Sequence, residues 1–145
     1  MPASTLNASV HYAGDQLFIG TPSSGHAQII DTKGDRKLAP TPVELLLVGL
    51  ATCAGAEVVS ILEKKRQVIS GYHIEITATQ ADDHPRRFLT FHINHIVHGR
   101  TLSEKAVADA ISLAEAKYCP IAATLRPTAE IASSFEVVAG DSAKR

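Results

Sequence analysis

The feature that most constrains the fold is a long apolar segment, which predicts a helix over residues 41–66. Thr41 is suited to cap its first turn, Pro42 takes the first helical position, and Glu44 completes a capping box three residues after the cap. Apolar residues recur with a 3.6-residue period, and further ones make the first half apolar nearly all round. Such a helix is buried on several sides, in a core or under another subunit.

Strand-like runs lie on both sides of this helix. Strands are predicted over 5–13, 16–20, 26–31, 71–80, 87–99 and 128–138. The segments 71–80 and 87–99 alternate apolar and polar residues about a polar turn, which predicts an antiparallel hairpin with one solvated face. A second helix is predicted from Ser103 to Tyr118, with a short helix or turn near 121–124. This order of elements predicts an α+β fold.

Composition narrows the class of protein. A chain of 145 residues, 45% hydrophobic and 20% charged, predicts one globular domain over residues 1–145. The net charge is −1 and no run of basic residues forms an electrostatic footprint for nucleic acid or anionic lipid, so neither nucleic acid nor a membrane is an expected partner. The longest strictly apolar run, 45–51, is too short to span a bilayer, and the N-terminus lacks the pattern of a secretory signal. A cytoplasmic location is therefore expected.

Two cysteines carry the chemistry that the sequence suggests. Cys53 lies in the middle of the predicted apolar helix among small side chains, and Cys119 precedes a proline at the end of the second helix. The spacing does not suit zinc, whereas a pair of thiols suits transient disulfide chemistry in a reducing compartment. A thiolate that attacks a peroxide becomes a sulfenic acid, which a second thiol can convert to a disulfide. A buried, inert cysteine is the simpler alternative.

The residues around both cysteines resemble a known family. The stretches TPVELLLVGLATCAGAEVVSILEKKR and EAKYCPIAATL are similar to the OsmC/Ohr family of thiol-dependent hydroperoxide reductases, most of all to its OsmC-like branch. The resemblance implies an OsmC-like fold, with antiparallel sheets wrapped around two central helices in an intertwined homodimer. It also implies that Cys53 is the peroxidatic thiol and Cys119 the resolving thiol. The implied partners are a small-molecule peroxide and a dithiol reductant of the lipoyl or thioredoxin type, with no cofactor.

The sequence departs from the family where the reactive thiol is activated. Family enzymes carry a glutamate ten residues before the reactive cysteine, paired with an arginine from the N-terminal region, but residue 43 is valine here. Glu44 lies nine residues before Cys53, which places it on the far side of the same helix. Arg36 is the first arginine in the chain, so Glu44 and Arg36 are the candidate supporting residues. Further basic candidates are Lys37, Arg86, Arg87 and Arg126.

Histidines offer a weaker alternative. His92, His95 and His98 are spaced three apart on a predicted strand, so neighbours in this series point to opposite faces and cannot converge on a metal. We expect these side chains to be polar cross-strand residues, with His95 near a sheet edge. No glycine-rich phosphate motif is present.

Three functions remain open from the sequence. The first is a homodimeric thiol peroxidase that works through a Cys53–Cys119 disulfide. The second is a binding module in which an apolar cleft holds a small molecule and the cysteines are reactive without turnover. The third is a structural dimer with inert thiols.

Overall fold

A computed structural model describes residues 3–140 of the chain. Contacts divide the chain into two compact units, Met1–Leu46 and Leu47–Arg145. Each unit is described by itself below. The expectation of a single OsmC-like domain over residues 1–145 stays a prediction.

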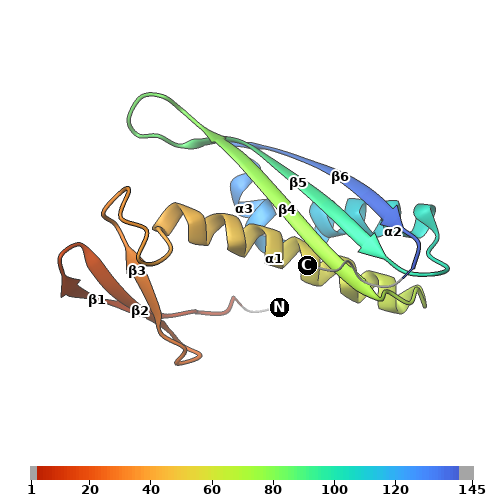
Figure 1. The fold of residues 1–145 in the computed structure, drawn as a ribbon, viewed down its shortest axis with the longest axis horizontal. Helices are drawn as coiled ribbons and strands as arrows, with labels where there is room; N and C mark the ends of the chain where they lie inside the picture. The colour runs from red at the N-terminus through yellow and green to blue at the C-terminus, as the bar shows by residue number, and fades with distance from the viewer. Residues whose placement is uncertain (1–2, 141–145) are drawn as a thin grey trace. The chain divides into compact units, whose positions relative to one another are not determined.

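The first unit is a three-stranded antiparallel meander (Figure 1). Its strands are β1 (Ala8–Gly14), β2 (Leu17–Pro22) and β3 (Gln28–Asp31). Asp15 and Gln16 form the tight turn between β1 and β2, and both take positive φ angles, 51° and 64°. Residues that join two strands in so short a turn adopt this left-handed conformation, which aspartate tolerates better than most. The three strands predicted over 5–13, 16–20 and 26–31 are therefore confirmed, with ends that differ by a few residues.

The second unit is a three-stranded sheet with helices packed on one face (Figure 1). The sheet order is β4–β5–β6, with β4 (Gly71–Gln80), β5 (Phe88–His98) and β6 (Glu130–Val138). The helices are α1 (Pro42–Lys64), α2 (Glu104–Leu113), the π-helical turn η1 (Ala114–Tyr118) and α3 (Pro120–Leu125). The first residues of α1 belong to the first unit. These elements confirm the α+β class.

The predicted hairpin is confirmed, and a parallel strand completes its sheet. β4 pairs with β5 antiparallel, with Ile74 opposite His95 and Ile76 opposite Ile93. β6 pairs with β5 in parallel, so the expectation of antiparallel sheets fails at this strand. The reason is the connection: two strands can run parallel only when a long crossover returns the chain to its starting end, and α2, η1 and α3 form that crossover.

The core of the second unit lies between the sheet and its helices. It joins apolar residues of α1, β5, α2 and the first position of η1, all less than a tenth exposed: Val58, Ile61, Leu62, Val97, Val107, Ala110, Ile111 and Ala114. Ser103 caps α2, since its side chain accepts a hydrogen bond from the N–H of Ala106. The predicted second helix is therefore correct in position, but its last turn is π-helical instead of α-helical.

Helix α1 begins where predicted and ends earlier. The helix ends at Lys64 instead of Arg66, because Arg66 takes a φ of +57° and leaves the helical conformation. With 23 residues it is long and apolar enough to cross a membrane by length and composition alone. The prediction that no segment could span a bilayer considered only the strictly apolar run 45–51, which is shorter than the helix. Length and composition are weak evidence, since the core helix of a soluble protein passes the same test, and α1 places Leu50, Val58 and Leu62 in the core.

Candidate functional site

Cys53 lies on a turn of α1 that is held against β4. Two residues further on, Gly55 is buried, and a Cβ at this position would meet Ile74 Cδ1 at 2.5 Å and a Tyr72 ring carbon at 3.6 Å. Only a residue without a side chain allows the helix and the strand to approach this closely. The turn that carries Cys53 is thereby fixed, and the Cys53 side chain itself is half-buried.

Cys119 joins η1 to α3 and is almost completely buried, with 2% of its surface exposed. The backbone N–H of Cys119 donates to the carbonyl oxygen of Ala114, five residues earlier, at 2.8 Å, which closes the π-helical turn. Cys119 is also the cap of α3, where its sulfur accepts a hydrogen bond from the N–H of Ala122 at 3.4 Å. Pro120 then takes the first helical position. The thiol is therefore fixed from both sides.

The fold brings the two thiols together. The Cys53 and Cys119 side chains lie close enough for Cys53 to influence the pKa of Cys119, and both are free thiols. Burial is the main cause that raises the pKa of Cys119 to about 11, with a further contribution from the hydrogen bond to Cys53. Cys119 is therefore a protonated thiol at neutral pH. It can donate a hydrogen bond to the sulfur of the more exposed Cys53.

A groove lies along α1 on the C-terminal side of Cys53. Its volume is about 300 Å³, and it is lined by Glu57, Ser60, Ile61, Lys64, Lys65, Leu113 and Tyr118. Residues three, four, seven and eight apart on a helix share one face, so Glu57, Ser60, Ile61 and Lys64 continue the face on which Cys53 lies. Tyr118 on the opposite wall directly precedes Cys119. The groove therefore begins one helical turn from Cys53.

The two supporting residues expected from the sequence have local partners within the first unit. Glu44 forms the predicted capping box: its carboxylate accepts from the N–H of Thr41 at 2.9 Å, and its own N–H donates to the Thr41 hydroxyl at 3.2 Å. These hydrogen bonds lower the pKa of Glu44. The carboxylate is thus already used to satisfy the free N–H groups of the first turn.

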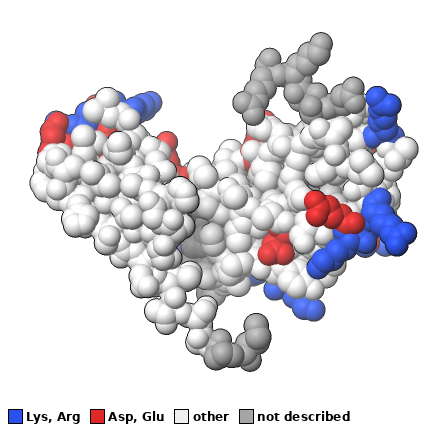
Figure 2. All heavy atoms as spheres, turned by 90° about the horizontal axis from the view of Figure 1, so that it is seen from below, with Lys and Arg blue, Asp and Glu red and all other residues white. Residues whose placement is uncertain are grey.

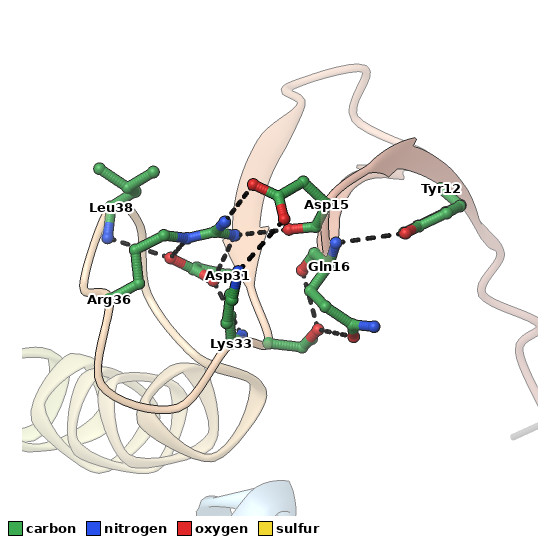
Figure 3. Close-up of polar contacts among 8 residues, drawn as sticks. Tyr12, Asp15, Gln16, Asp31, Lys33, Arg36 and Leu38 are labelled. Atoms are coloured by element: carbon green, nitrogen blue, oxygen red, sulfur yellow. Dashed lines mark hydrogen bonds and ion pairs between the residues drawn. The ribbon is translucent and has the colours of Figure 1, made fainter.

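Arg36 is the centre of an ion-pair cluster between β3 and the turn after β1 (Figure 3). Its guanidinium donates to both carboxylate oxygens of the buried Asp31, at 2.9 and 3.0 Å, and to the Asp15 carboxylate at 2.6 Å. The hydrogen bond from Arg36 is the main cause that lowers the pKa of Asp31 far below its usual value. Two carboxylates therefore neutralise the charge of Arg36, which gives this residue a structural role in the first unit.

The sequence interpretation missed a buried polar pair on the inner face of the sheet. The Tyr72 hydroxyl is 2.5 Å from Nδ1 of His95, and the two rings stack at 5.9 Å. The prediction that His95 lies near a sheet edge is wrong, since β5 is the central strand and His95 is fully buried. His95 shares its face of the strand with Ile93 and Val97. The alternation of apolar and polar residues along the strand therefore indicates that His95 is buried.

The remaining histidines do not converge with His95. His92 is exposed and its Nε2 lies 3.1 Å from the hydroxyl of Ser134, on the outer face of the sheet. Among residues 3–140, no group of three or more histidine, cysteine or acidic side chains could hold a metal ion.

Comparison with known proteins identifies the family. The family model described as "OsmC-like protein" matches residues 33–134, which include both cysteines. The chain belongs to the OsmC-like family. Protein YhfA of Escherichia coli strain K12 is 36% identical over 135 residues, and the match covers 92% of this chain and 99% of YhfA.

Solved structures agree with the fold. A hypothetical protein from Aquifex aeolicus VF5 is 27% identical with a TM-score of 0.87, over 96% of this chain and 100% of that one. A protein from Legionella pneumophila described as an organic hydroperoxide resistance protein, OsmC, has a TM-score of 0.71 over 94% of this chain and 99% of that one. At 14% identity the second likeness concerns the fold alone.

Proposed function

We propose that this OsmC-like protein is a thiol-dependent peroxidase that reduces organic or hydrogen peroxides through Cys53 and Cys119. The observation that carries the proposal is the contact between a half-exposed thiol and a buried, protonated one beside an open groove. Membership of a family with members described as organic hydroperoxide resistance proteins supports it.

The reaction follows from the different environments of the two thiols. The Cys53 thiolate attacks the outer oxygen of the peroxide, the O–O bond breaks, and the alkoxide leaves as an alcohol after taking up a proton. Cys53 is then a sulfenic acid. The Cys119 sulfur attacks it, the disulfide forms, and the sulfenic oxygen leaves as water with the Cys119 proton. Cys53 is the first nucleophile in this scheme because Cys119 is buried and its pKa of about 11 keeps it protonated.

A dithiol reductant of the lipoyl or thioredoxin type completes the proposed cycle. One of its thiolates attacks the disulfide at Cys53, the more exposed sulfur, and releases Cys119 as a thiol. The second thiol then releases Cys53 and leaves as an oxidised disulfide. A cytoplasmic location and a homodimeric state are part of the same proposal.

The first test is turnover of cumene hydroperoxide with a dithiol as reductant. We expect Cys53→Ser to lose turnover to the uncatalysed background, because serine cannot form the sulfenic acid. Cys119→Ser should still consume one equivalent of peroxide and then accumulate a sulfenic acid that dimedone traps and mass spectrometry detects. Equal turnover by the wild type and Cys53→Ser would refute the proposal.

A second candidate function is binding of a small molecule without turnover. The environment of Arg36 and Glu44 favours it, because both are committed to other partners in the first unit and neither is available as a catalytic ion pair. Native mass spectrometry of the freshly purified protein distinguishes the two functions. A co-purifying ligand in a protein that does not turn over peroxide would favour this second function.

A further inference from the structure

The carbonyl oxygen of Glu115 has no donor in the main chain that follows it. The N–H of Cys119, four residues later, donates to Ala114 instead, at 2.8 Å, and closes the π-helical turn. The same pattern would pair Glu115 with the N–H of the fifth residue after it, but that residue is Pro120, which has no N–H. A carbonyl at the end of a helix then needs a donor from elsewhere.

Arg126 supplies that donor from the far end of α3. Its Nη2 donates to the carbonyl oxygen of Glu115 at 2.8 Å, across 11 residues of chain. Burial raises the pKa of the Glu115 carboxyl, and the positive charge of Arg126 acts in the opposite direction. The guanidinium thus interacts with the main chain and the side chain of Glu115, and it joins the two ends of the segment that contains Cys119.

The hydrogen bond from Arg126 completes a ring that passes through the Cys119 sulfur. The N–H of Ala122 donates to Cys119 Sγ at 3.4 Å, and the N–H of Arg126 donates to the carbonyl oxygen of Ala122 at 2.9 Å. The guanidinium returns to Glu115, the neighbour of Ala114, and Ala114 accepts from the N–H of Cys119. Arg126 therefore restrains the sulfur of Cys119 through Ala122.

Helix α3 depends on such a restraint because it has only six residues. Isolated helices shorter than about 12 residues are marginal in water. The first turn of α3 is held by the fully buried Ala122 and by Ile121, whose Cδ1 would lie 3.7 Å from a Cβ at Gly49, one turn before Cys53 on α1. These contacts fix the start of α3 against α1, and Arg126 fixes its end.

We propose that Arg126 is a positioning residue for the resolving thiol and holds Cys119 where its sulfur can attack Cys53. Its effect is confined to the second step, the formation of the disulfide, because the first step requires Cys53 alone. A cation that activated Cys53 would accelerate the first step instead. This inference rests on the proposed function, since it assigns a residue to one step of that reaction.

Disulfide exchange with bis(2-hydroxyethyl) disulfide separates the two steps without a peroxide. The Cys53 thiolate attacks one sulfur of this uncharged reagent, forms a mixed disulfide and releases one mercaptoethanol. The Cys119 sulfur then attacks Cys53, which expels the second mercaptoethanol and leaves the Cys53–Cys119 disulfide. Both mercaptoethanol thiolates take up the protons that the two cysteines lose. Acid quenching and mass spectrometry follow the mixed disulfide with time, and Cys119→Ser stops at this species.

We expect Arg126→Met to slow the second step about fivefold, as for the loss of one exposed hydrogen bond, and to leave the first step unchanged. Arg126→Lys should recover part of this rate, because its ammonium can donate to the same carbonyl. The matched control is Arg87→Met, which removes a hydrogen bond of the same kind outside the ring, from Arg87 Nη1 to the carbonyl oxygen of Thr128 at 3.0 Å. The control should leave both steps unchanged.

A second step in Arg126→Met that is as fast as in the wild type, or equally slow in Arg87→Met, would overturn the inference. A loss of rate shared by both steps would also overturn it, since a general disturbance of the fold has that effect. Equal slowing by Arg126→Lys and Arg126→Met would count against it in the same way. Peroxide turnover by Cys53→Ser that matches the wild type would refute the proposed function instead, and the effect of Arg126 on disulfide exchange would still stand.

Discussion

At the scale of single residues, burial decides the chemistry of the polar groups inside the second unit. Burial raises the pKa of Tyr72 and lowers the pKa of His95 to about 4, so both side chains are neutral at physiological pH. Nε2 of His95 has no hydrogen-bond partner among the residues that the structure describes. A buried histidine that gains a proton here would carry a charge without a counter-ion, which is strongly unfavourable.

His95 therefore makes the stability of the protein depend on pH. The unfolded chain takes up a proton on this histidine near pH 6.5, whereas the folded protein does so only near pH 4. The unfolded state binds more protons between these values, so the free energy of unfolding should fall as pH drops from 6.5 to 4, by on the order of 3 kcal/mol. Urea unfolding across this range measures the effect.

The control for this prediction is His95→Phe, which keeps an aromatic ring against Tyr72 and has no group that titrates. The slope of unfolding free energy against pH should be smaller in this variant. An unchanged slope would show that other groups cause the acid sensitivity. Asp31 is a separate contributor, whose lowered pKa places its loss of stability below pH 4.

At the scale of elements, local sequence signals were sufficient for the helix starts and the hairpin. The capping box at Thr41 and the cap at Ser103 each depend on a few neighbouring residues, so the sequence pattern predicts them directly. The parallel pairing of β6 with β5 depends on where a long crossover returns the chain. The π-helical turn depends on one additional residue between α2 and Cys119. Neither of these two features has a short-range sequence signal.

The contact between α1 and β4 gives a prediction at this scale. Gly55→Val should destabilise the protein by about 1–3 kcal/mol, because the new side chain overlaps the space of Ile74 and forces α1 away from β4. Thermal unfolding followed by circular dichroism measures the change.

Gly49 provides the matched comparison on the same helix. A Cβ at this position meets only Ile121 Cδ1, at an ordinary distance of 3.7 Å. Gly49→Ala should therefore stabilise the protein by up to about 1 kcal/mol, since alanine favours the helix more than glycine. Equal destabilisation by both substitutions would contradict a specific close contact at Gly55.

At the scale of the whole molecule, α1 leaves apolar surface without a cover in the chain that the structure describes. Val43 and Val48 are 43% and 62% exposed. An apolar hollow of about 480 Å³ lies on another face of the helix, lined by Thr52, Gly55, Ala56, Val59, Tyr72 and Ile74. On the face drawn in Figure 2, lysine, arginine, aspartate and glutamate side chains lie in small groups. Apolar surface of this kind marks interaction sites.

A second copy of the chain is the cover that we expect. Size-exclusion chromatography with light scattering should give twice the chain mass of 15.4 kDa. Val48→Glu should shift the protein towards the monomer, because the charge would be buried without a partner. Val68→Glu, at an exposed valine outside α1, is the control and should not change the mass. A monomeric wild type would contradict this expectation.

The candidate site was predictable in part. Cys53 and Cys119 could be selected from sequence because they are the two cysteines of the chain and lie in motifs that resemble a family. The groove could not, because one wall comes from α1 and the other from the end of α2 and η1, which lie far from α1 in sequence. The ion pairs of Arg36 could not be predicted from the sequence either, because they require the sheet of the first unit to bring Asp15 and Asp31 close to the same guanidinium.

The π-helical turn before Cys119 has a consequence for how this family can diverge. Loss of one residue from 114–118 would restore ordinary helical spacing and rotate every later side chain by about 100°. The sulfur of Cys119 would then point away from α1 although the cysteine itself were kept. A relative with both cysteines but a turn shorter by one residue would keep the two thiols without holding them close together. The number of residues before this cysteine is therefore as informative as the presence of the cysteine.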